Sequence, residues 1–175
     1  MNTPQNFKDC IGEKYVYENN MIALPVMIEG LPSQIEVERY ALNLKTSFHI
    51  SLVCVGKIIE KHNISIPDFE EKVVKDFFEF GKANNVFLKH YRDEFRFVAH
   101  NERRTVVVMC EVVNLSGFFD LLNKKYDLDL EYPQTHVTLY TLQPDAGIFL
   151  TDSFDIQNFT KVIEAPEDVK KAFGL

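Results

Sequence analysis

Residues 47–55 read SFHISLVCV, and this stretch decides how the first half of the chain folds. Its β-branched and aromatic residues predict a strand, and Gly56 after it is a turn signal. Residues 135–142, THVTLYTL, predict a similar strand in the second half. Each strand carries a histidine followed two residues later by a hydroxyl side chain.

Further elements are expected on both sides of these two strands. Residues 35–46 alternate well enough to form a strand, although a short helix is an alternative. The other predicted elements are strands at residues 21–28, 94–100 and 104–113, helices at residues 67–83 and 115–126, and a short helix near residues 166–173. Because this order lacks regular βαβ alternation, we expect an α+β fold with mainly antiparallel sheets in a single domain, 1–175.

Composition and charge restrict the class of partner. The chain has 175 residues, of which 46% are hydrophobic, which is enough to build one compact core. Its formal net charge is −7, and no basic run could follow a long phosphate backbone. We therefore expect no long nucleic acid as partner. A small anion can still bind wherever two or three cationic groups gather.

The cysteines and the apolar segments indicate a location. Cys10, Cys54 and Cys110 have no zinc-like spacing, and we expect free thiols in a reducing compartment. The first twenty residues contain no apolar stretch of signal-peptide type, and the longest apolar run, residues 21–28, is too short to span a membrane. We expect a cytoplasmic protein, monomeric and without a membrane partner.

The two histidine strands repeat one short pattern. Residues 49–52 read HISL and residues 136–139 read HVTL, so both have the form histidine, apolar, hydroxyl, apolar. Successive side chains of a strand point to opposite faces, so each histidine shares a face with its hydroxyl. The resulting pairs are His49 with Ser51 and His136 with Thr138.

These residue types suit cleavage of a phosphate ester. One group must take a proton from the attacking oxygen while another protonates the leaving oxygen, and histidine can do either near neutral pH. A hydroxyl can donate to a non-bridging phosphoryl oxygen. The scheme requires no cofactor and no metal. A single copy would be weak, because the pattern arises by chance at roughly a few per cent of histidines, but two copies are much rarer.

HISLVCVG at residues 49–56 and HVTLYT at residues 136–141 resemble the paired motifs of the two-histidine (2H) phosphoesterase superfamily, which includes 2′-5′ RNA ligase-like proteins and cyclic nucleotide phosphodiesterases. The resemblance implies a bilobal, pseudo-twofold fold, with two mainly antiparallel sheets facing across a central cleft and helices on the outside. It also implies metal-independent hydrolysis of 2′,3′-cyclic or related phosphodiesters. The sequence departs from many relatives at Tyr140 and Thr141, where a basic residue is common.

Strand alternation adds three candidates for substrate binding. Lys45 lies on the predicted cleft face before His49, and its ammonium group could help to neutralise a phosphate. Tyr132 and Tyr140 lie on the corresponding face around His136 and could stack on a base. The alternatives are a solvated lysine and tyrosines that only pack against the sheet.

The leading hypothesis is a phosphodiesterase that acts on a small nucleotide or an RNA end carrying a 2′,3′-cyclic phosphate. A 2′,5′-linked phosphodiester is the second choice of substrate. His49 and His136 would be base and acid, in an order that the pseudosymmetry leaves open. The alternatives are a non-catalytic nucleotide-binding module on the same fold and an interaction domain in which the two motifs are coincidental.

Overall fold

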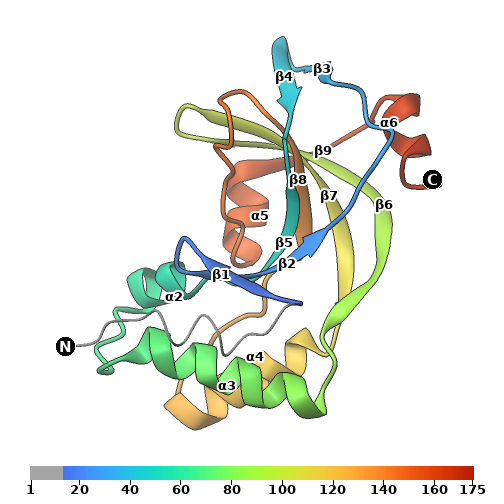
Figure 1. Cartoon of the computed structure of the whole chain (residues 1–175). Coiled ribbons are helices and arrows are strands. Elements are labelled where there is room, and N and C mark those ends of the chain that lie inside the picture. The colour runs from blue at the N-terminus through green and yellow to red at the C-terminus, as the bar shows by residue number, and fades with distance from the viewer. Residues whose placement is uncertain (1–13) are drawn as a thin grey trace.

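The computed structural model of the chain describes residues 14–175, and Figure 1 shows how their elements are arranged. Within these residues no helix is long and apolar enough to cross a membrane. In chain order the elements are β1 (Val16–Glu18), β2 (Met21–Val26), β3 (Gln34–Val37), β4 (Tyr40–Leu44), β5 (Phe48–Val53), α2 (Val55–His62), α3 (Phe69–Ala83), β6 (Phe87–His100), β7 (Arg103–Val113), α4 (Leu115–Tyr126), β8 (His136–Thr141), α5 (Ser153–Phe159), β9 (Thr160–Ile163) and α6 (Glu167–Lys171).

The strands form one antiparallel sheet. Its main order is β1-β2-β5-β8-β7-β6-β9, and the β3–β4 hairpin joins it where β4 pairs with β8. The expected α+β class with antiparallel pairing is therefore confirmed. The expected division into two facing sheets is not confirmed, because hydrogen bonds join the nine strands of residues 14–175 into a single sheet.

One face of this sheet carries the main hydrophobic core. Ile50, Leu52 and Val137, on the two motif strands, are fully buried in it. Helices α3 and α4 lie side by side against this core (Figure 1), and the rings of Phe77 and Phe118 make an edge-to-face contact at 5.1 Å between centroids. The alternate residues of both motif strands must therefore point to the opposite face.

Two smaller apolar clusters cover parts of that opposite face. In one of them, side chains of α5 and of residues 147–150 pack on β6 and β7; it contains Val98, Val107, Met109, Ile148 and Leu150, with Ile156 and Phe159 against them. In the other, Phe149 packs beside Met21 and Ala23 of β2 and beside Cys54. The motif strands β5 and β8 lie between the β2 side and the β7 side of the sheet, so their outward residues stand between these two clusters.

Most elements agree with the sequence-based expectations. The helices expected at residues 67–83 and 115–126 are α3 and α4, and the expected hairpin is formed by β6 and β7. The strands expected at residues 21–28, 47–55 and 135–142 are β2, β5 and β8, and the last short helix is α6. Helices α2 and α5 and strands β1 and β9 were not predicted.

Residues 35–46 form neither a single strand nor a helix. Strands β3 and β4 make a hairpin whose turn residues, Glu38 and Arg39, have φ angles of 51° and 69°. Such left-handed pairs give the turn that matches the twist of a hairpin, and they usually contain Asn, Asp or Gly. The turn was missed because neither residue is one of these.

Gly56 was expected to close β5 with a turn, but it lies in the first turn of α2. Its backbone N–H donates to the carbonyl oxygen of Asn20 at 3.0 Å. A Cβ atom on Gly56 would stand 3.1 Å from the Cβ of Asn20, which is closer than side chains normally approach. The glycine therefore allows α2 to pack closely on the turn between β1 and β2.

Candidate functional site

Strands β5 and β8 are antiparallel neighbours, and their register brings the two motifs together. Ile50 pairs with Val137, so a local twofold axis passes between these residues. The histidines are diagonal neighbours, with Cα atoms about 8 Å apart by standard strand spacings. The register aligns each histidine with the hydroxyl of the other motif, His49 with Thr138 and His136 with Ser51.

These four side chains open into one pocket of about 230 Å³ on the face opposite the main core. Lys45 also lines it, although it lies between β4 and β5, where no strand continues the alternation from His49. Among residues 14–175, the Ser51 and Thr138 hydroxyls have no hydrogen-bond partner, so both are free to donate to a ligand. The structure therefore brings five of the seven predicted site residues together.

His136 is held in one tautomer. Its Nδ1 lies 2.9 Å from the carbonyl oxygen of Gln134, and because a carbonyl only accepts, Nδ1 carries the proton. Nε2 is then the ring nitrogen available for proton exchange. The side chain is buried, with 7% of its surface exposed. Burial lowers the pKa of His136, the bond to Gln134 opposes this, and the nearby His49 lowers it further.

His49 is less buried but is affected in the same direction. Burial lowers its pKa, and the positive charge of Lys45 lowers it further, while Glu18 opposes the change. Both imidazoles are therefore mainly neutral near pH 7 in the free protein. Bound phosphate would raise both pKa values, because its negative charge favours the imidazolium form. The pair is thus arranged to take up a proton together with an anionic ligand.

Tyr140 does not lie on the pocket face, contrary to expectation. Val106 pairs with Tyr140 and Val107 with Thr138, which leaves Leu139 as an extra residue on β8. This bulge breaks the alternation after Thr138. Tyr140 consequently turns into the main core, where it is fully buried and its hydroxyl donates to the carbonyl oxygen of Pro32 at 2.9 Å.

Replacing this tyrosine should affect stability rather than activity. Tyr140→Phe removes the hydroxyl and leaves the Pro32 carbonyl unsatisfied, which should lower the free energy of unfolding by about 1 kcal/mol. Urea unfolding measures the loss, with the wild type as reference. Unchanged stability in Tyr140→Phe would contradict this role of the hydroxyl.

Tyr132 is also not part of the histidine pocket. It is 55% exposed and lines a different hollow with Arg92 and Glu111. Residues 127–135 form no strand, so the alternation that was extended backwards from His136 does not apply to them. Pro133 interrupts any strand there, since it lacks a backbone N–H.

The pocket contains residues that sequence reasoning missed. Arg103, at the start of β7, lines it and donates from Nη1 to the carbonyl oxygen of Gly147 at 2.9 Å. It supplies a cation that the residues after the second motif lack. The wall opposite β5 comes from the irregular segment 145–149, including Phe149. No periodicity marks this segment, so only the tertiary structure reveals its place.

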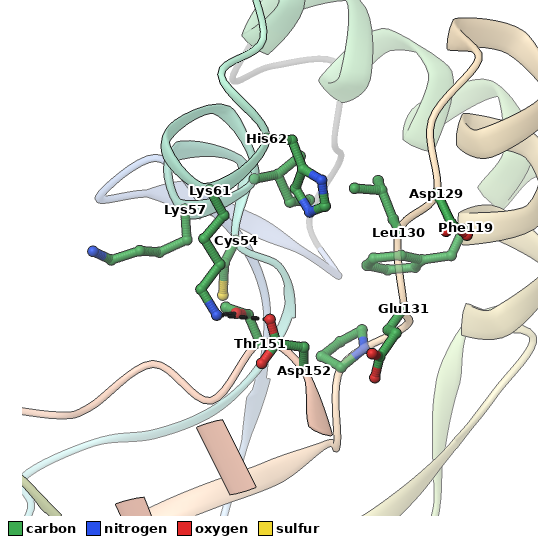
Figure 2. A pocket seen from close by; sticks show the side chains of 12 residues that line it. Cys54, Lys57, Lys61, His62, Phe119, Asp129, Leu130, Glu131, Thr151 and Asp152 are labelled. Atoms are coloured by element: carbon green, nitrogen blue, oxygen red, sulfur yellow. Dashed lines mark hydrogen bonds and ion pairs between the residues drawn. The ribbon is translucent and has the colours of Figure 1, made fainter. Parts of the chain in front are cut away.

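A network centred on Lys61 of α2 holds the end of this segment in place. Its ammonium group donates to Thr151, Asp152 and Asp155 at 2.7–3.0 Å, and Asp155 also accepts from the backbone and hydroxyl of Thr151. Figure 2 shows Lys61 directed at Thr151 and Asp152. The adjoining hollow, of about 80 Å³, contains Cys54, whose pKa burial raises to about 12. Such a thiol is a poor nucleophile.

Comparisons of the chain with protein-family models, with curated proteins and with solved structures found no match. The chemistry of the pocket must therefore be inferred from its own residues. The pocket holds two imidazoles, each across from a hydroxyl, and is also lined by Lys45 and Arg103. These groups have the chemistry to bind a small anion and to exchange protons with it.

Proposed function

We propose that the chain is a metal-independent phosphodiesterase that hydrolyses a 2′,3′-cyclic phosphate, or a 2′,5′-linked phosphodiester, of a small nucleotide or RNA end. The observation that carries the proposal is the register of β5 and β8, which sets His49 and His136 diagonally in one pocket with a hydroxyl across from each. The 2H phosphoesterase resemblance agrees with this geometry.

In the proposed reaction the phosphorus atom sits between the two imidazoles. The neutral histidine removes a proton from water, whose oxygen attacks phosphorus, and the protonated histidine gives its proton to the ribose oxygen that leaves. One P–O bond forms and one breaks, which opens the ring to a phosphomonoester. The first imidazole then loses its proton to solvent and the second takes one up from solvent, which restores the starting state.

The hydroxyls and Lys45 bind the phosphate that the histidines act on. Ser51 and Thr138 donate to its non-bridging oxygens, where charge increases in the transition state. Lys45 also lines the pocket and offsets that charge, while Arg103 lines it farther along β7.

Removing either hydroxyl tests this role. Ser51→Ala and Thr138→Ala should each lower kcat/KM by about 10- to 100-fold, because a hydrogen bond to a charged group contributes about 1.5–3 kcal/mol. Steady-state kinetics on a 2′,3′-cyclic nucleotide measure the effect, with the exposed Ser65→Ala as control. Because of the local twofold axis, we expect losses of similar size in the two variants. Wild-type rates in both would contradict a role of the hydroxyls in binding the phosphate.

The pseudo-twofold, bilobal arrangement belongs to the same proposal. The strand order is symmetric about the boundary between β5 and β8, since β2 flanks β5 as β7 flanks β8. Each half also contributes one of the two helices that pack together, α3 and α4.

We also propose a reducing, cytoplasmic location for this activity. Cys54 and Cys110 are free thiols buried in the fold, which is the state that a reducing compartment maintains. Cys10 lies outside the described residues. Recovery of the native protein from an oxidising compartment would contradict this part.

The experiment that tests the function is a substrate panel assayed with a metal chelator present. Its members are 2′,3′-cyclic nucleotides, 2′,5′-linked dinucleotides and short RNAs ending in a 2′,3′-cyclic phosphate. We expect turnover of at least one member, unaffected by the chelator. Calorimetry on the same compounds covers the alternative of a non-catalytic binding module, for which binding without product formation is the expected result. Turnover that the chelator abolishes contradicts the proposed mechanism.

A further inference from the structure

A second, larger pocket adjoins the histidine pocket. It measures about 420 Å³ and shares Arg103 and residues 147–149 with the first pocket as a common wall. Its other side is built from α5 and from the hairpin turn between β6 and β7, around Asn101. A ligand held between His49 and His136 could therefore continue past Arg103 into this space.

Three rings line the second pocket as a group. His100 and Phe159 stand 4.1 Å apart at their ring centroids, and Phe154 contacts Phe159 edge to face at 6.1 Å. Phe154 is 60% exposed, although it is a large apolar side chain on a short helix. An exposed aromatic beside two partly covered rings provides a surface on which a planar base can stack.

The charge of the two pockets favours an anion. Among the basic side chains that line them, Lys61 is paired with Asp152 and Asp155, and Lys57 is paired with Glu60. This leaves Lys45 and Arg103 as the cations that face a single further carboxylate, Asp145. The chain as a whole carries −7. This local excess of positive charge in an acidic protein matches a short phosphate backbone better than it matches an uncharged or acidic partner.

The position of Arg103 indicates how far such a backbone would extend. Val107 pairs with Thr138, and Arg103 lies four residues earlier on β7, about 13 Å away along the strand. The backbone at Arg103 is therefore well removed from the phosphate between the histidines. Arg103 is placed to bind the next phosphate of a chain that leads towards the three rings.

We propose that the second pocket binds the penultimate nucleotide of an RNA, the one before the terminal nucleotide that carries the cyclic phosphate. The substrate is then a single-stranded RNA end rather than a free mononucleotide. The preceding base stacks on Phe154, beside Phe159 and His100, and its 3′-linked phosphate lies at Arg103. This inference rests on the proposed function of the histidine pocket and identifies its substrate class.

Phe154→Ala tests the stacking surface without disturbing the core, because this ring is mostly exposed. The measured quantity is the ratio of kcat/KM for a pentanucleotide RNA ending in a 2′,3′-cyclic phosphate to kcat/KM for the corresponding mononucleotide. In the wild type the ratio should exceed ten. In Phe154→Ala it should fall by about tenfold, since stacking of one base contributes about 1–3 kcal/mol. Phe87→Ala, another partly exposed aromatic on the far end of β6, should leave the ratio unchanged.

A binding measurement separates failure of this inference from failure of the proposed function. Fluorescence anisotropy with a labelled pentanucleotide ending in a 3′-phosphate requires no turnover. If no substrate is hydrolysed, weaker binding by Phe154→Ala but not by Phe87→Ala still supports the stacking site. Equal kcat/KM values for the two wild-type substrates, or equal binding by wild type and Phe154→Ala, overturn it.

Discussion

His49→Ala and His136→Ala should each lower kcat/KM for a 2′,3′-cyclic nucleotide by about 10²–10⁴-fold, the usual contribution of a general acid or base. Each change removes one of the two groups that move protons at phosphorus, and water is a poor replacement in a half-buried pocket. The double variant should lose little more than the worse single variant, because acid and base act in one step. Steady-state kinetics with the wild type as reference measure these losses.

His90→Ala is the matched control for both variants. His90 is 51% exposed on β6, where its Nε2 lies 3.7 Å from a carboxylate oxygen of Glu111. Its removal should change kcat/KM by less than twofold. Circular dichroism and the unfolding midpoint of each variant exclude global unfolding as the cause of a loss. Near wild-type rates in both folded single variants would end the proposal of paired catalysis.

The part of the site predicted from sequence depends on local geometry. Because side chains alternate along a strand, His49 and Ser51 must share a face, and the same holds for His136 and Thr138. The apolar residues between them, such as Ile50, go to the core and orient the strand. Helices α3 and α4 could be predicted for a similar reason, because their apolar stripes repeat at helical spacing.

Alternation fails where the strand itself becomes irregular. The bulge at Leu139 turns Tyr140 into the core, and the backbone around Pro133 takes Tyr132 to another surface. The bulge has no clear signal in the sequence, because it depends on which strand lies alongside. Pro133, in contrast, is a signal that the strand does not extend back to Tyr132. Strand alternation therefore predicts the residues within each motif, and it fails at the first residue after the second motif and four residues before it.

Residues brought by tertiary pairing were beyond prediction. Arg103 enters the pocket because β7 pairs with β8, and Phe149 because the segment before α5 folds back over β2. Lys61 holds the end of that segment from α2, a helix that the sequence did not indicate. Each of these contacts joins segments that are distant in the sequence, so it could be predicted only once the packing of those segments was known.

The pH dependence of the reaction should show how the pocket affects its histidines. Catalysis needs one neutral and one protonated imidazole, so kcat/KM should be bell-shaped in pH. Burial lowers both pKa values below the usual 6.5 of histidine, so the protonated partner is lost as pH rises through a value below 6.5. The maximum should therefore lie below pH 6.5, and on the alkaline limb kcat/KM should fall by about tenfold for each pH unit. The alkaline limb of kcat should lie at higher pH, because bound phosphate stabilises the imidazolium.

Lys45→Met changes this profile in a direction that no purely structural role explains. The charge of Lys45 lowers the pKa of His49, so its removal should raise that pKa and move one limb of the kcat/KM profile to higher pH. The height of the profile should fall as well, since a cation is lost from the phosphate site. Lys89→Met removes an exposed lysine that pairs with Glu111, and should leave both limbs in place. If kcat/KM rises steadily to pH 8, or if Lys45→Met lowers the height without moving a limb, the imidazoles are not the groups that set the pH dependence.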